Sequence, residues 1–163
     1  MTAASSDLSK SAERFRSRLS ELGHEVEVLS LAESTRTAKE AADTIGCTVA
    51  QIAKSIVFRD ARTDEPILVV ASGTNRVSPA KVRALADTEL EQASGSYVKK
   101  RLGFAIGGVP PAGHDSPPRI FLDEDLRRFD EVWAAAGTPF AVFRLSPESL
   151  PALTGATWCD VAE

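Results

Sequence analysis

The run from Pro66 to Ser72 constrains the fold of this chain more than any other segment, because it is apolar at both odd and even positions. A strand with one face in water alternates apolar and polar residues, whereas a strand covered on both faces reads as a continuous apolar run. The run therefore predicts the central strand of a sheet that other elements cover from both sides.

Helices and further strands are expected to alternate irregularly around this strand. Helical spacing and capping residues predict helices at 7–22, 37–45, 78–86 and 96–102, a turn at 48–51, and a short helix opened by Ser146 and Pro147. Apolar or alternating runs predict strands at 25–29, 54–59, 104–107, 119–122, 131–135, 140–145 and 157–161. This order predicts an α/β fold with a mixed sheet. The length suits one domain over residues 1–163, with the helix of residues 1–23 packed on it.

Charge limits the classes of partner. The chain has 19 Lys and Arg against 23 Asp and Glu, a net charge of −4, whereas a general nucleic-acid binder carries a basic excess that neutralises phosphates. We therefore expect no DNA partner. Lys99, Lys100 and Arg101 nevertheless form a dense positive run, which is either a solvated helix face or a local contact for phosphates.

Cysteine usage and the absence of long apolar segments indicate a cytoplasmic protein. Cys47 and Cys159 stand far apart and form no CxxC motif, as is typical of reduced thiols. Residues 1–10 are polar, and the longest apolar run, Ile67 to Ala71, is far too short to span a bilayer. We expect neither secretion nor association with a membrane.

Several classes of enzyme lack their signatures here. The chain has no GxxxxGK[ST] phosphate loop, no GxSxG elbow and no GxGxxG fingerprint. Its two histidines, His24 and His114, lie in no metal-binding motif, so we expect no metal site and no cofactor. His114 is either a general base or a solvated residue of its Gly/Pro/Asp loop. Catalysis in such a chain must rely on positioning and on backbone donors.

Lys54 departs from ordinary strand patterning. It shares strand parity with Ile56 and Phe58, so its stem points toward the core if those two side chains do. A buried ammonium is costly unless it meets an anion or carbonyl oxygens. Lys54 therefore either extends to solvent at the end of its strand or binds a phosphate or carboxylate.

The sequence Gly107-Gly108-Val109-Pro110-Pro111 predicts a stiff loop. Glycine lacks the Cβ that would block a close approach to the backbone, and proline fixes φ near −65°. Such a loop is either a connector between strands or a place where a ligand approaches the main chain.

Three segments, in their order and spacing, resemble the YbaK family of trans-editing aminoacyl-tRNA deacylases, also called the prolyl-tRNA-synthetase-associated domain. They are Gln51-Ile-Ala-Lys54-Ser-Ile-Val-Phe58, the apolar strand Ile67 to Ala71 followed by a helix, and Gly103-Phe-Ala-Ile-Gly-Gly-Val-Pro-Pro-Ala-Gly113. The resemblance covers roughly Thr37 to the C-terminus. It implies a single α/β domain in which a strongly curved mixed sheet encloses a small pocket.

The resemblance also implies an activity, the hydrolysis of the ester that joins a wrong amino acid to tRNA. Lys54 matches the essential lysine that orients the aminoacylated tRNA end, and its role would be catalytic. The loop Gly107, Gly108, Val109, Pro110 and Pro111 matches the GxxxP loop that places the terminal adenosine and the scissile carbonyl. Amides of Gly107 and Gly108 would donate to the developing oxyanion. The nucleophile would be water or the 2′-hydroxyl of the tRNA, and Lys99, Lys100 and Arg101 would contact the tRNA.

The amino acid that is cleared stays open between cysteine and alanine. Ser55 after the lysine resembles the cysteine-clearing members. These carry an acidic residue in the last long strand, where our alignment places Val142. Gly137 falls near a second pocket loop, but Thr138 and Pro139 match neither type. The resemblance makes tRNA(Pro) the expected substrate and prolyl-tRNA synthetase an expected partner.

Two other functions compete with a deacylase. The chain can be a binding module that keeps the fold and the pocket but recognises a tRNA end or a nucleotide without hydrolysis, since a fold does not guarantee an activity. It can also be a metabolic enzyme that holds a small carboxylate with Lys54. The lysine together with the intact loop favours the deacylase over the binding module.

Overall fold

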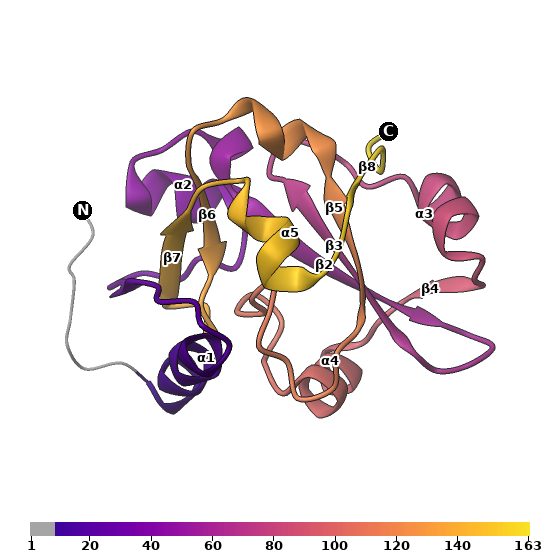
Figure 1. Cartoon of the computed structure of the whole chain (residues 1–163), viewed down its shortest axis with the longest axis horizontal. Helices are drawn as coiled ribbons and strands as arrows, with labels where there is room; N and C mark the ends of the chain where they lie inside the picture. The colour runs from indigo at the N-terminus through magenta and orange to yellow at the C-terminus, as the bar shows by residue number, and fades with distance from the viewer. Residues whose placement is uncertain (1–8) are drawn as a thin grey trace.

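The apolar run forms strand β3 (Pro66–Ser72), and every residue of it is buried. Leu68 and Val70 pack into one core cluster, while Ile67, Val69 and Ala71 pack into a second. Successive side chains of a strand point to opposite faces, so the two clusters lie on opposite sides of β3. The computed structural model describes residues 9–163 and confirms the predicted central strand (Figure 1).

Five strands form the sheet around β3, in the order β4-β2-β3-β5-β8. Strand β2 (Ala53–Asp60) runs antiparallel to β3 and to β4 (Leu90–Gln92). Strand β5 (Arg119–Asp123) runs parallel to β3 and to β8 (Trp158–Cys159). The sheet is therefore mixed, as predicted.

A second, antiparallel sheet has the order β1-β7-β6. It contains β1 (Val28–Ser30), β6 (Val132–Ala135) and β7 (Ala141–Leu145). The mixed sheet was predicted but this second sheet was not. Among residues 9–163, the backbone pairing between the two sheets is one isolated parallel bridge, between Ile52 just before β2 and Trp133 of β6.

In the described part of the chain, residues 9–163, five α-helices and two short 3₁₀ helices surround the sheets (Figure 1). Their bounds are α1 Lys10–Glu21, α2 Ala38–Ile45, η1 Val49–Gln51, α3 Pro79–Ala86, α4 Gly95–Leu102, η2 Glu124–Arg128 and α5 Ser149–Thr154. Two predicted caps are confirmed: the amide of Thr48 donates to Oε1 of Gln51 at 3.0 Å at the start of η1, and Ser78 caps α3 ahead of its first proline. Thr37 and Glu40 form a further capping box at the start of α2, which was not predicted. Residues 7 and 8 of the first predicted helix lie outside the described residues.

The predicted strand at 104–107 is wrong. Gly103, just before it, and Gly107, its last residue, have φ of 85° and 89°, outside the range of strand residues, and the amide of Gly108 donates to the carbonyl of Ala105 at 2.9 Å to close a turn. The first strand also lies later than predicted, at Val28–Ser30, because pairing with β7 sets its position. Neither β4 nor η2 was predicted.

Helix α1 packs against the rest of the fold through Ala12, Phe15 and Leu19, all fully buried. The ring of Phe15 lies 5.0 Å from the ring of Phe143 on β7, measured between centroids. Figure 1 shows α1 below β6 and β7 and beside the loop that follows α4. Leu22, the C-cap residue of this helix, is exposed.

Candidate functional site

Two cavities adjoin on one side of β2. The first has a volume of about 630 Å³ and lies toward the turn after β3, and the second has a volume of about 440 Å³ and lies toward α2 and β6. Both are lined by one shared set of residues from β2, from the turn after β3 and from the loop after α4: Lys54, Ser55, Ile56, Gly73, Ile106, Gly107 and Val109. The sequence-predicted lysine and loop therefore meet at the boundary between the cavities.

Lys54 is half-buried and its Nζ donates a hydrogen bond to the carbonyl of Gly73 at 3.3 Å. Burial lowers the pKa of this ammonium, and the negative charge of Asp123 partly offsets the effect. The lysine thus does not simply extend into open solvent at the end of its strand. It presents a partly desolvated donor to both cavities.

Ser55 and Val142 also lie where the alignment expects them to meet a ligand. The Oγ of Ser55 is buried and has no hydrogen-bond partner among residues 9–163. An unpaired buried hydroxyl is costly, so a ligand that pairs with it would gain affinity. Val142 is 2% exposed, pairs with Ala135 of β6, and lines the second cavity.

The two glycines of the loop differ in role. Gly107 lines both cavities, and its amide has no hydrogen-bond acceptor in the described part of the chain. The amide of Gly108 already donates to Ala105, and a Cβ on Gly108 would lie 2.5 Å from the backbone of Thr138. The glycine at 108 therefore permits close packing against protein, and not the approach of a ligand. Of the two predicted oxyanion donors, therefore, the amide of Gly107 is the one without an acceptor among residues 9–163.

Three more predicted residues line neither cavity. Pro110 and Pro111 are the buried end of the loop. Gly137 has a φ of 102°, and its amide donates to the carbonyl of Gly108 at 3.0 Å. Gly137 therefore supports the loop without contacting the cavities.

His114 is not a solvated loop residue. Its Nε2 lies 2.7 Å from the carbonyl of Pro110, to which it donates, and its ring meets Phe104 edge to face at 6.3 Å between centroids. Burial lowers the pKa of this imidazole, although the bond to Pro110 opposes the shift. Because His114 lines neither cavity, it braces the loop and is not placed as a general base.

Sequence reasoning missed an acidic support beneath the turn after β3. Asp123 is 1% exposed, and its Oδ2 accepts hydrogen bonds from the amide of Ser72 at 3.0 Å and from the side chain of Asn75 at 2.8 Å. The Asn75 amide also donates to Asp125 at 2.8 Å. These bonds fix the turn whose Gly73 carbonyl receives Lys54. Asp123 lies on β5, far from this turn in the sequence, so no local pattern could have linked the two.

Two arginines at the cavities were also missed. Arg36 lines the second cavity, where its side chain packs over Gly107, and Arg76 lines the first. Neither has an ion-pair partner among residues 9–163. Single arginines in polar segments give no sequence signal of this kind.

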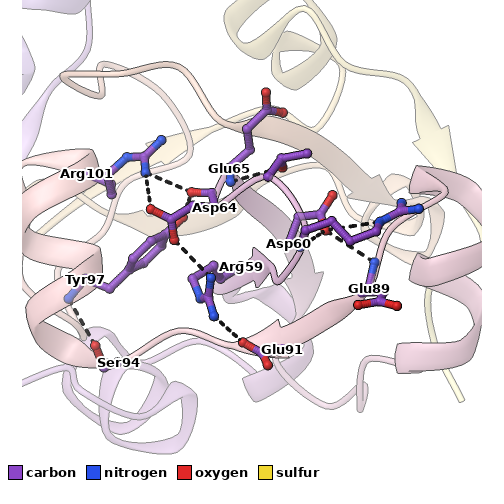
Figure 2. A network of polar contacts seen from close by, with 11 residues as sticks. Arg59, Asp60, Asp64, Glu65, Glu89, Glu91, Ser94, Tyr97 and Arg101 are labelled. Atoms are coloured by element: carbon purple, nitrogen blue, oxygen red, sulfur yellow. Dashed lines mark hydrogen bonds and ion pairs between the residues drawn. The ribbon is translucent and has the colours of Figure 1, made fainter.

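The basic run on α4 divides into two parts. Figure 2 shows Arg101 bound to Asp64 of the β2–β3 turn, with a distance of 3.0 Å to Oδ2 and 2.8 Å to the backbone carbonyl. Arg59 binds the other oxygen of Asp64 at 3.0 Å and also pairs with Glu91 of β4. Arg101 is therefore occupied within the protein. Lys99 and Lys100 are exposed and line neither cavity.

Residues 9–163 contain no group of three or more His, Cys, Asp or Glu side chains placed to hold a metal ion. Within the same range, no helix combines the length and the apolar character needed to cross a membrane.

Comparison with known sequences gives one family. The model of the aminoacyl-tRNA editing domain matches residues 32–153. The uncharacterized protein YwhH of Bacillus subtilis (strain 168) is 32% identical over 149 residues, which cover 91% of this chain and 94% of that protein. The proline–tRNA ligase of Limosilactobacillus fermentum is 31% identical over 112 residues, which cover 66% of this chain but 20% of the ligase.

Solved structures agree. A candidate trans-editing enzyme for prolyl-tRNA synthetase is 47% identical, with a TM-score of 0.90 over 96% of this chain and 99% of that one. A scaffold protein for computational grafting of linear epitopes is 43% identical, with a TM-score of 0.88 over the same shares. Since the family model spans most of the chain, and the Lys54 strand and glycine loop meet at its cavities, this protein belongs to the family of aminoacyl-tRNA editing domains.

Proposed function

We propose that this protein hydrolyses the ester of a small mischarged amino acid on tRNA. The observation that carries the proposal is the half-buried ammonium of Lys54 at the boundary of two cavities, opposite a loop whose Gly107 amide is free. An ammonium and an oriented amide are the donors that an activated ester needs, because charge develops on its carbonyl oxygen.

Each residue then has a defined task. Lys54 orients the tRNA end and neutralises charge near it, and the Gly107 amide donates to the developing oxyanion. The larger first cavity suits the terminal nucleoside, and the second, lined by Val142, suits the amino acid. The nucleophile is water or the 2′-hydroxyl next to the ester, since an aminoacyl ester is already activated and positioning lowers much of its barrier.

The finer identity of the substrate is part of the proposal. The unpaired Ser55 hydroxyl supports a small polar acyl group such as cysteine, with alanine as the other candidate. The relatives that are proline–tRNA ligases support tRNA(Pro) as the carrier and prolyl-tRNA synthetase as a partner in the cytoplasm.

A panel of aminoacyl-tRNAs tests the activity directly. The parent protein should release cysteine or alanine from tRNA(Pro), and Lys54→Ala should lower kcat/KM by about 10²–10³-fold, the usual cost of a lost transition-state donor. Lys54→Arg should recover little, because a planar guanidinium does not replace a compact ammonium. Lys10→Ala removes an exposed lysine as the matched control. A parent that binds tRNA but hydrolyses no ester would contradict the deacylase and favour the binding module.

Two groups of basic residues are candidates to contact the tRNA backbone, and the salt dependence of tRNA binding distinguishes between them. Arg36 and Arg76 lie at the cavities, whereas Lys99 and Lys100 lie on α4. Each lost phosphate contact reduces the slope of log K against log salt by about one unit. We expect the Arg36→Ala/Arg76→Ala variant to lose about two units, and the Lys99→Ala/Lys100→Ala variant to show whether the tRNA also reaches α4. An unchanged slope for both variants would place the nucleic-acid face elsewhere.

A further inference from the structure

Helix α1 holds both ends of the loop that borders the cavities. The Nη2 of Arg14 donates to the carbonyl of Gly103, where α4 ends. The Nη1 of Arg18 donates to the carbonyl of Gly113 at 2.8 Å, and its Nη2 pairs with Asp115 at 2.6 Å. Arg14 and Arg18 are four residues apart and so share one face of the helix.

The contact at the first end is shielded from water. The guanidinium of Arg14 lies 4.7 Å from the ring centroid of Phe104, which is fully buried. A cation over an aromatic face is more strongly attracted when it is desolvated. The side chain of Arg18 is 32% exposed, so the second end is held by a partly shielded ion pair and a hydrogen bond.

Helix α1 also fixes a second support of the loop. A Cβ on Gly137 would lie 2.7 Å from the carbonyl oxygen of Ser11, so the turn before β7 packs directly on the helix backbone. The amide of Gly137 in turn donates to the carbonyl of Gly108 at 3.0 Å. Helix α1 therefore contacts the segment around Gly107 in two ways. Its arginines bind the two ends of the loop, and its backbone packs against the Gly137 turn, which binds Gly108.

We propose that α1 is a clamp that positions the Gly107 amide relative to Lys54, with Arg14 and Arg18 as positioning residues. Lys54 stands on β2, whose place is set by pairing with β3 and not by α1. No residue of α1 lines either cavity, so the helix acts through the loop. The helix lies outside residues 32–153, which the family model matches. The expected effect of the clamp on kcat rests on the proposed function, whereas its effect on the position of the loop does not.

Hydrogen exchange and kinetics on the full chain test the clamp. In Arg18→Ala and Arg14→Ala, the hydrogen-bonded amides of Gly108, Asp115 and Gly137 should exchange at least about tenfold faster, while those of β3 stay unchanged. With the best ester of the panel, kcat should fall by about tenfold or more and KM should change by less than about twofold, because a small misplacement of a donor costs mainly the chemical step. Arg16→Ala is the matched control, since the one partner of Arg16 among residues 9–163 is Glu13 on the same helix.

Two further variants separate positioning from general stability. Arg18→Lys should recover part of kcat, because an ammonium can still donate to the Gly113 carbonyl. Asp115→Asn removes the ion pair without touching the helix and should loosen the same loop amides by a smaller factor.

Unchanged exchange at the amides of Gly108, Asp115 and Gly137 would overturn the clamp, and so would exchange that rises equally in β3. A parent without any deacylase activity would overturn the proposed function alone, since the exchange measurement decides the clamp without substrate.

Discussion

Strand β3 and the loop of residues 103–115 are held in place by different means. Strand β3 lies between two apolar clusters and pairs with β2 on one side and β5 on the other. The loop pairs with no strand. Three of its carbonyls accept hydrogen bonds from Arg14, Arg18 and Gly137, which lie elsewhere in the sequence, and a fourth accepts one from His114 within the loop. Phe104, Val109 and Ala112 of the loop also pack into the apolar core. The strand is held by buried apolar area and by pairing on both sides, whereas the loop depends in addition on single polar contacts, most of them distant in sequence.

Because of this difference, we expect changes in β3 to affect mainly stability and changes around the loop to affect mainly activity. A change in β3 removes packing that the whole fold shares, so it should lower the free energy of unfolding. A change around the loop moves the Gly107 amide by a small distance, so it should lower turnover before it lowers stability. The following experiments test that separation, beginning with the largest expected effect.

Leu68→Ala should cost about 2–5 kcal/mol of unfolding free energy, because it empties a fully buried position on β3. Chemical denaturation measures this loss. The same substitution at Leu85, which is 45% exposed on α3, is the control and should cost far less. The activity per folded molecule should stay within about twofold of the parent, since one leucine on β3 does not line a cavity. A large loss of specific activity in Leu68→Ala would break the separation.

Gly108→Ala, unlike Leu68→Ala, should lower turnover more than stability. Its new Cβ would meet the backbone of Thr138 at 2.5 Å and push the loop, and with it Gly107, away from its place. We expect kcat to fall by about 10- to 100-fold, with a smaller loss of stability than in Leu68→Ala. Gly95→Ala is the control, because a Cβ there meets only Ile106 at an ordinary 3.7 Å. Normal turnover in Gly108→Ala would show that the loop is only a connector.

Val142→Asp tests whether the side chain at position 142 contacts the substrate in the second cavity or is part of the core of β7. A carboxylate at this buried position is costly unless it meets the α-ammonium of a substrate or another polar group. If it does, the ratio of cysteinyl to alanyl ester hydrolysis should rise several-fold, since a hydrogen bond to a charged group contributes about 1.5–3 kcal/mol. Val142→Thr is a control of similar volume without charge. A folded Val142→Asp protein with an unchanged ratio would make this residue ordinary core.

His114 should produce the smallest effect, a pH dependence of stability. Burial lowers its pKa in the folded state, so below about pH 6.5 the unfolded chain takes up a proton that the folded chain does not. Stability should therefore fall as the pH drops from about 6.5 to the lowered pKa of the folded state, and then change no further from this group. His114→Gln can still donate to Pro110 and should lack this part of the slope in thermal denaturation between pH 7.5 and 5. Identical slopes in the two proteins would remove His114 from the pH response.

The elements that the sequence predicted well are those that local patterns specify. The bounds of β3 were predicted correctly, and α2 and α3 end or begin at their predicted caps, because apolar periodicity and capping act over a few neighbouring residues. The false strand at 104–107 arose because the same local pattern contained Gly103 and Gly107, whose positive φ values a strand cannot accept. The split into two sheets could not be predicted, since strand pairing depends on residues far apart in the chain.

For the candidate site, the sequence alone determined which residue types were present: a lysine at the start of a strand with apolar neighbours, and a loop of glycines and prolines. Tertiary structure decided their roles. It left the amide of Gly107 free, turned Gly108 toward Thr138, tied Arg101 to Asp64, and placed Arg36 and Arg76 at the cavities. The physical reason is that patterns of a few residues specify helices, strands and turns, whereas free donors, close backbone contacts and ion pairs arise only when distant segments pack together.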